Sequence, residues 1–198
     1  MTSVQTFYLR DVPADVGGGT LPSGLLSTWE ASTGAQFGAS ARSLRDSSGA
    51  ATSTYSETAG TIAIGDPCDQ AALQAVSAPL AAQSIGAGDW TVGFAARWAA
   101  SGSGYGWRGR AALHLVNGST GAIRTTIFAL QTIGGDKTNI TAYRTAYSTT
   151  VAGGAATVTA GDYLALEIGV QTYTTVGIGF PDIDVRVGNT TAISSDNA

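Results

Sequence analysis

The chain is poor in the side chains on which most enzymes and nucleic-acid-binding proteins depend. It has one cysteine and one histidine in 198 residues, and only 12% of its residues are charged, about half of the roughly 25% usual for globular proteins. The lone Cys68 excludes an intrachain disulfide and a cysteine-based zinc site, and we expect it to be a buried apolar residue. One lysine, nine scattered arginines and a net charge of −4 offer no basic patch for phosphates or an anionic membrane. We therefore expect neither a nucleic-acid partner nor a membrane partner.

Long apolar runs are missing as well. No segment approaches the roughly 18 consecutive apolar residues that suggest a transmembrane helix. The N-terminal residues lack the basic and apolar regions of a signal peptide. We expect a protein that is made in the cytoplasm and is not anchored in a membrane.

The most abundant pattern is alternation of apolar and polar residues between clusters of Gly, Asp, Asn and Ser, which is typical of half-buried strands. It predicts an all-β fold, an antiparallel β-sandwich or jelly roll of about 8–10 strands with a long irregular N-terminal segment. The expected strands are 5–10, 52–64 (one or two strands), 69–76 (extended rather than helical), 90–98, 111–116, 123–133, 140–150, 157–173 and 183–187. Asn117 to Gly121 is expected to be the turn of a hairpin.

We expect a single domain. Residues 50–190 form its sandwich core, and residues 1–49 contribute a strand and an extended segment that belong to the same domain. The first strand is expected to stop before Pro13. The weakly patterned stretch from Pro13 to Gly49 either reaches a neighbouring subunit as an arm or wraps over the sheets. Residues 191–198 form a tail.

Six residues are candidates for contacts with other proteins. The glycine-rich stretch from Ser101 to Arg110 is expected to be a turn that either folds back over the sheet edge or presents its aromatic and arginine side chains. Two further aromatic residues lie in the irregular N-terminal segment, where Leu25 and Leu26 are expected to help pin it. The candidates are Tyr105, Trp107, Arg108, Arg110, Trp29 and Phe37.

The sequence shows no catalytic constellation and implies no cofactor. His114 alternates with Leu113 and Leu115, which favours a histidine on a sheet surface or at a subunit contact over a catalytic base. No nucleophile elbow is present, and no motif surrounds Cys68. We therefore predict that the protein is not an enzyme.

Two sets of carboxylates are further candidates for a site. A paired-carboxylate glycosidase would have to use the glutamates Glu30, Glu57 and Glu167, of which Glu167 is expected on an outward face, where it pairs with Arg186 if their strands are neighbours. Asp182 and Asp184 share a strand face, but the remaining oxygen ligands of a calcium site are not apparent. Neither set defines a site, and no metal is predicted.

Three strings resemble β-sandwich virion structural proteins of tailed bacteriophages: FYLRD (7–11), ALHLVNGSTGAIRTTIFAL (112–130) and AGDYLALEIGVQ (160–171). The resemblance implies a non-enzymatic subunit on the outer capsid surface, of the cement or decoration type. Its partners would be the major capsid protein and itself, as a homotrimer. A carbohydrate- or receptor-binding sandwich of a tail or fibre, with Trp98, Tyr105 and Trp107 stacking on sugars, is the alternative. A jelly-roll enzyme is the third possibility.

Overall fold

Two β-sheets packed face to face form the body of the molecule. The computed structural model describes residues 7–30, 37–45, 53–57, 68–98, 106–138, 144–174 and 183–187. These residues form twelve strands and one 3-10 helix, η1 (Gly38–Ser40), and contain no α-helix. The prediction of an all-β sandwich is confirmed. The twelve strands exceed the expected 8–10, because alternation is hard to recognise in very short strands.

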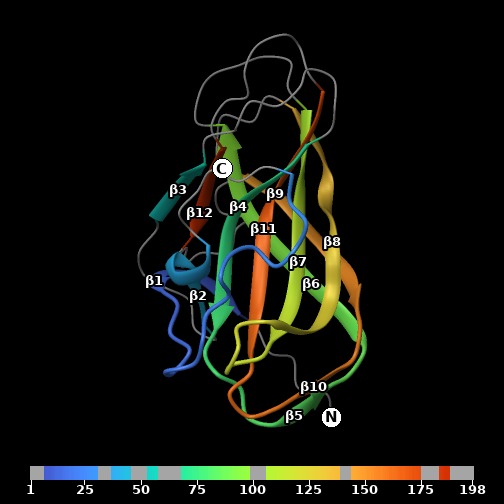
Figure 1. Cartoon of the computed structure of the whole chain (residues 1–198). Helices are drawn as coiled ribbons and strands as arrows, with labels where there is room; N and C mark the ends of the chain where they lie inside the picture. The colour runs from blue at the N-terminus through green and yellow to red at the C-terminus, as the bar shows by residue number, and fades with distance from the viewer. Residues whose placement is uncertain are drawn as a thin grey trace.

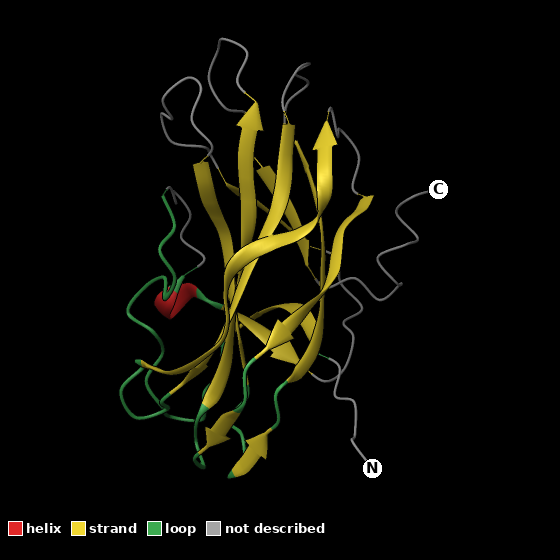
Figure 2. Cartoon of the chain, turned by 90° about the vertical axis from the view of Figure 1, so that its right-hand side faces the viewer, coloured by secondary structure: helices red, strands yellow, loops and turns green. Residues whose placement is uncertain are grey.

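The larger sheet has six strands and the second has four (Figures 1 and 2). The six-stranded order is β1 (Tyr8–Pro13), β2 (Arg42–Arg45), β4 (Cys68–Ser77), β11 (Tyr163–Thr174), β7 (Gly106–Val116) and β8 (Ile123–Thr138). The four-stranded order is β3 (Ser53–Glu57), β12 (Ile183–Val187), β6 (Gly88–Trp98) and β9 (Arg144–Gly153). A small third sheet pairs β10 (Ala156–Val158) with β5 (Gln83–Ile85).

All pairings among these strands are antiparallel except that of β2 with β4. Strand β2, from the N-terminal part of the chain, thereby joins β1 to the sandwich core. A long connection makes this parallel pair possible, because parallel neighbours cannot be linked by a tight turn. Residues 1–49 and 50–190 therefore contribute to the same sheet.

The main hydrophobic core lies between the two large sheets. Leu73 of β4, Leu113 of β7 and Ile168 of β11 belong to one buried cluster with Phe94 of β6 and Val151 of β9. A second, smaller cluster comprises Val16, Ala41, Val76, Val116, Tyr163 and Ala165. Val16 and Ala41 come from the irregular N-terminal segment, and this cluster lies on the face of the six-stranded sheet opposite the main core. Both faces of the central strands of that sheet are therefore covered.

Several boundaries differ from the predictions. Strand β1 continues through Pro13, which its edge position permits, with an irregularity in pairing after Arg10. The expected strand 157–173 is interrupted by a turn closed by a bond from the Asp162 amide to the Thr159 carbonyl. The expected turn at 101–110 is wrong from Gly106 onward, where β7 begins. The hairpin at Asn117 to Gly121 and the extended form of 69–76 are confirmed.

The side-chain amide of Gln70 in β4 is buried and has no hydrogen-bond partner among the described residues. Its side chain is 1% exposed, and neither polar atom of its amide has a partner in the described part of the chain. An unsatisfied buried amide costs free energy that an apolar group of similar shape avoids. We expect Gln70→Met to raise the free energy of unfolding by about 1–2 kcal/mol in urea titrations. Gln83→Met on exposed β5 is the control and should change nothing; a loss of stability in Gln70→Met would contradict the prediction.

Candidate functional site

A segment of the N-terminal region covers the outer face of the six-stranded sheet. Residues 14–30, which we call the strap, cross the central strands of this sheet (Figure 1). The strap has no regular secondary structure, so its backbone groups must find partners elsewhere. Of the two alternatives for this region, these residues adopt the wrap over the sheet.

Glu167 of β11 is the centre of the contact between strap and sheet. Its side chain is 0% exposed. Oε1 accepts hydrogen bonds from the Leu26 amide at 2.6 Å and from Gln74 Nε2 at 2.9 Å. Oε2 accepts from the Ser27 amide and from Trp29 Nε1, both at 2.9 Å. Four N–H donors thus surround a carboxylate that has no contact with water.

Gln74 of β4 extends this contact. Its Nε2 also donates to the Gly24 carbonyl at 3.0 Å, and its Oε1 accepts from the Gly38 amide at 2.9 Å. The Gln74 amide therefore links Gly24 of the strap and Gly38 of η1 to Glu167. The condition for a pair of Glu167 with Arg186 is not met, because β11 and β12 belong to different sheets. The expected outward position of Glu167 is wrong, because Glu167 is buried beneath the strap.

His114 lies beside this carboxylate, also beneath the strap. It is 3% exposed. The expected sheet-surface or subunit-contact histidine is instead covered by the strap of its own chain. Nε2 lies 2.8 Å from Ser27 Oγ, and Nδ1 lies 3.1 Å from Thr126 Oγ1 of β8. Burial lowers the pKa of His114 below 6.5, and the negative charge of Glu167 opposes this effect. His114 is therefore neutral at pH 7.

A serine next to a neutral histidine is a pair that hydrolases use, but its surroundings differ from theirs. The second ring nitrogen of His114 meets the Thr126 hydroxyl, whereas a triad places a carboxylate there. The amides of Leu26 and Ser27 already donate to Glu167, so they are not free to stabilise an oxyanion. This arrangement fixes the strap.

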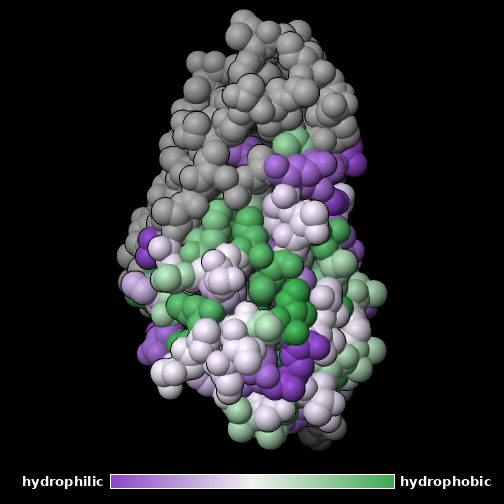
Figure 3. Space-filling model, in the orientation of Figure 1, coloured by the Kyte–Doolittle hydropathy of each residue, from purple (hydrophilic) through white to green (hydrophobic). Residues whose placement is uncertain are grey.

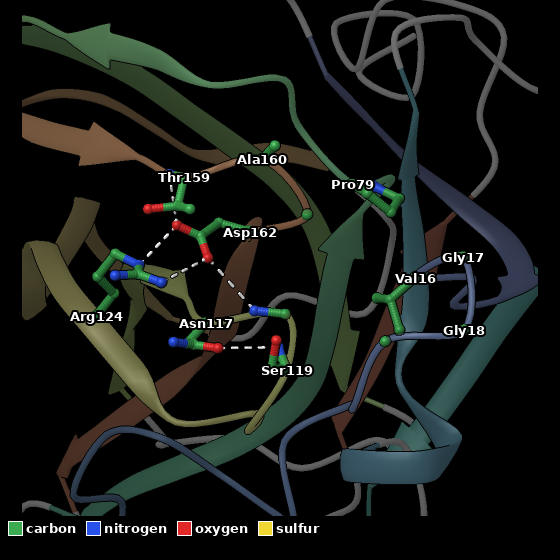
Figure 4. A pocket seen from close by; sticks show the side chains of 13 residues that line it. Val16, Gly17, Gly18, Pro79, Asn117, Ser119, Arg124, Thr159, Ala160 and Asp162 are labelled. Carbon is green, nitrogen blue, oxygen red and sulfur yellow. Dashed lines mark hydrogen bonds and ion pairs between the residues drawn. The ribbon is translucent and has the colours of Figure 1, made fainter.

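An open slot lies at the end of the sandwich where the strap meets three loops. Its volume is about 300 Å³. Figure 4 shows Val16, Gly17, Gly18 and Pro79 on one side and Asn117, Ser119, Arg124 and Asp162 on the other. The loops fit closely, since the Thr20 amide donates to the Gly118 carbonyl at 2.7 Å and the Tyr163 hydroxyl donates to the Thr20 carbonyl at 2.8 Å. The slot is thus a rigid, mostly polar recess.

Asp162 holds the polar wall of the slot together. It accepts from Arg124 Nε at 2.6 Å and Nη2 at 3.0 Å, and from the amides of Thr159 at 2.8 Å and Gly118 at 3.4 Å. Burial raises the pKa of Asp162, but these hydrogen bonds and the charge of Arg124 outweigh it and keep the pKa below 3.8. The carboxylate remains ionised and its oxygens are occupied by the protein itself.

We expect Asp162→Asn to lower the free energy of unfolding at pH 7 by about 2 kcal/mol, because bonds to a charged acceptor are lost. The native pKa is lower than the unfolded one, so this stabilisation is complete above pH 3.8 and disappears as the pH falls through the native value. Urea titrations at pH 7 and pH 3 should therefore show a difference between wild type and variant that shrinks in acid. A difference independent of pH would contradict this assignment.

Three of the six predicted contact residues, Arg108, Arg110 and Trp29, have partners within the chain. Arg110 forms a two-pronged ion pair with Asp69, at 2.7 Å and 2.9 Å, and Arg108 pairs with Asp136 at 3.2 Å. Trp29 donates to Glu167 and covers Gly169, the residue that pairs with Arg110. These side chains support the sheet and strap instead of projecting from a loop.

The remaining candidates are less constrained by the structure. Phe37 is half-buried and precedes η1. Trp107 has its backbone in β7, while its side chain, Tyr105 and the side chain of Trp98 lie outside the described residues. The same holds for Asp182 and for the side chains of Glu57, Asp184 and Arg186, so the calcium hypothesis falls outside the described part.

The acidic groups around Cys68 form no metal site. Glu30 Oε2 accepts from the Asp69 amide at 2.7 Å. Burial, followed by the charges of Glu30 and Asp69, raises the pKa of the Cys68 thiol to about 11, so Cys68 is a buried, unreactive thiol, as predicted. Within the described ranges, no group of three or more His, Cys, Asp or Glu side chains is placed to hold a metal ion.

Comparison with known proteins adds no functional information. No protein family, no curated protein and no solved structure matches this chain. Among the described residues, no helix has the length and apolar character needed to cross a membrane. The functional argument therefore depends on the residues of this chain alone.

Sequence reasoning did not identify Glu167 as a structural centre. One signal was available: Ala165, Ile168 and Gly169 around it make both faces of β11 apolar or small, as in a strand that is covered on two sides. A carboxylate in such a strand has to be hydrogen-bonded. Its partners could not be named, because two are backbone amides 141 and 140 residues away and two are the side chains of Trp29 and Gln74, 138 and 93 residues away.

Proposed function

We propose that this chain is a non-enzymatic virion structural protein, of the capsid cement or decoration type found in tailed bacteriophages. It would bind the major capsid protein on the outer capsid surface and stabilise the lattice, with three copies of the chain acting together. The resemblance of three strings to such proteins suggests this role, and the described surface and polar groups support it.

The observation that carries the proposal is the use of the chain's polar groups. Among the described residues, the buried or half-buried groups His114, Glu167, Asp162 and Arg110 all bind other parts of the chain. Catalysis requires groups that are free to act on a substrate. These groups instead make the sandwich and its strap rigid, which suits a subunit under mechanical load.

The surface of the strap suits contact with another protein. Figure 3 shows apolar residues gathered near the middle of the strap-covered face, with polar residues beside them. Leu21, Leu25, Leu26 and Phe37 of this region are half-buried. An apolar centre with a polar rim is the usual composition of protein–protein interfaces. With few charges on the chain, covering such a face costs little desolvation.

The test is the number of copies in purified particles, measured by quantitative mass spectrometry. Hundreds of copies per particle are expected for a component of the head lattice. A handful would indicate a tail or vertex protein instead. A purified chain that remains a monomer and does not bind assembled particles would overturn the proposal.

Saccharide or receptor recognition is the second candidate, and the slot is the observation that favours it. Asn117 and Ser119 present polar side chains opposite Val16 and Pro79 (Figure 4). A recess with one polar and one apolar wall fits a sugar, which has hydroxyl groups and C–H faces. A glycan array with wild type, Asn117→Ala and Trp107→Ala would test this function. Sugar binding that depends on either residue would support it, and the absence of binding would exclude it.

A further inference from the structure

The strap is fastened to the sheet largely by polar contacts. Glu167 receives four hydrogen bonds, Gln74 joins Gly24 to Gly38, and His114 meets Ser27. Four residues of the strap pack into the small apolar cluster beside these contacts: Ala14, Val16, Leu21 and Leu26. When the strap lifts off the sheet, water can solvate these polar groups. Opening of the strap therefore exposes less apolar area than unfolding of the main core would.

We propose that the strap is an acid-sensitive latch: protonation of His114 releases residues 24–29 from the six-stranded sheet while the sandwich remains folded. This inference is independent of the proposed function. It concerns movement within one chain, whatever partner the protein binds.

The groups around His114 explain why a proton there is unfavourable while the strap is closed. Ser27 of the strap and Thr126 of β8 present hydroxyls to its two nitrogens. Ala165 of β11 is its partner across the strand pair. Tyr163, two residues before Ala165 in β11, is neutral, because burial raises its pKa to about 12. Within the described chain, Glu167 is the charged group that acts on His114, and its attraction is smaller than the effect of burial.

Opening of the strap returns the ring to water and its pKa toward 6.5. The closed form therefore binds protons less readily than the open form, and acid shifts the equilibrium toward the open form. If closed His114 stays neutral down to pH 5, linkage limits the increase in the open population between pH 7 and pH 5 to about 25-fold. The stabilisation is complete above pH 6.5 and declines as the pH falls.

Hydrogen exchange measured by NMR on the full chain tests this directly. The amides of Leu26 and Ser27, which donate to Glu167, report on strap opening. After correction for the intrinsic pH dependence of exchange, their protection should fall by up to about 25-fold between pH 7 and pH 5. Amides of Ile168 and Val170, whose side chains lie in the main core, should keep their protection.

The single histidine provides a second readout that needs no variant. The chain has one histidine, so imidazole resonances titrate without overlap from another residue. The midpoint of the His114 titration should coincide with the midpoint of strap opening. Separate midpoints, or an equal loss of protection at Ile168 and Val170, would overturn the proposal.

His114→Gln is the matched variant, because glutamine still offers hydrogen-bonding groups but does not titrate. Its Leu26 and Ser27 amides should show no change in corrected protection between pH 7 and pH 5. An unchanged acid response in this variant would assign the effect to another group and overturn the proposal. If the variant does not fold, the coincidence of the two wild-type midpoints decides alone.

Discussion

Replacing Glu167 by glutamine is expected to lower the free energy of unfolding by about 3 kcal/mol. The substitution keeps the size of the side chain but puts an NH2 group in place of one oxygen. Each oxygen of Glu167 now accepts two N–H donors, so at least two buried donors would face another donor. Urea or thermal unfolding at pH 7 measures the change.

Glu30→Gln is the control for this experiment. Glu30 is exposed, and its carboxylate accepts a hydrogen bond from the Asp69 amide and is hydrogen-bonded to the Cys68 thiol. An exposed bond of this kind is worth about 1 kcal/mol or less. Equal effects of the two substitutions would show that the strap does not depend on the buried carboxylate. Increased exchange at Leu26 and Ser27 in Glu167→Gln alone would locate the effect in the strap.

Gly169→Ala is expected to destabilise the chain by about 3 kcal/mol, at the upper end of the range for overpacked interiors. A Cβ at this position would lie 2.0 Å from the Gln70 carbonyl oxygen and 2.7 Å from Trp29 Cζ3. The first of these atoms belongs to the backbone of β4, so the β4–β11 pair has to separate. Trp29 would move as well, which weakens its bond to Glu167. Denaturant titration measures the loss.

Gly135→Ala is the matched substitution at a strand glycine that has room. Gly135 lies in β8, and a Cβ there meets nothing within 4 Å. Loss of glycine's freedom in the unfolded chain should leave stability unchanged or raise it by about 0.5 kcal/mol. A similar loss for both variants would mean that close packing at Gly169 is not the cause.

The fold class and most strands follow from local patterns. The face of β6 on which Val92 and Phe94 are buried was evident from alternation, and the turn after Asn117 from residues that favour tight turns. Such features depend on neighbours within about ten residues. The short strands β2 and β5 depend on distant partners, so alternation did not reveal them.

The site was harder to predict because its partners are far apart in the chain. The sequence marks His114 as a single titratable group but does not show that Ser27 covers it. The sequence places Arg110 in a turn, whereas the structure places it in β7 and pairs it with Asp69 of β4. Alternation predicts that polar residues within strands face solvent. It does not show that the strap covers the outer face of the six-stranded sheet, because the strap itself has no periodic pattern.

The bonds between the strap and Glu167 also constrain the order in which the chain is assembled. Leu26 and Glu167 are 141 positions apart, so a ribosome has made the first thirty residues long before their acceptor exists. Strand β11, which lies between β4 and β7, is equally late, and the six-stranded sheet stays incomplete without it. Contacts of such long range make folding slow. We expect the N-terminal residues to dock last, after synthesis has passed residue 174.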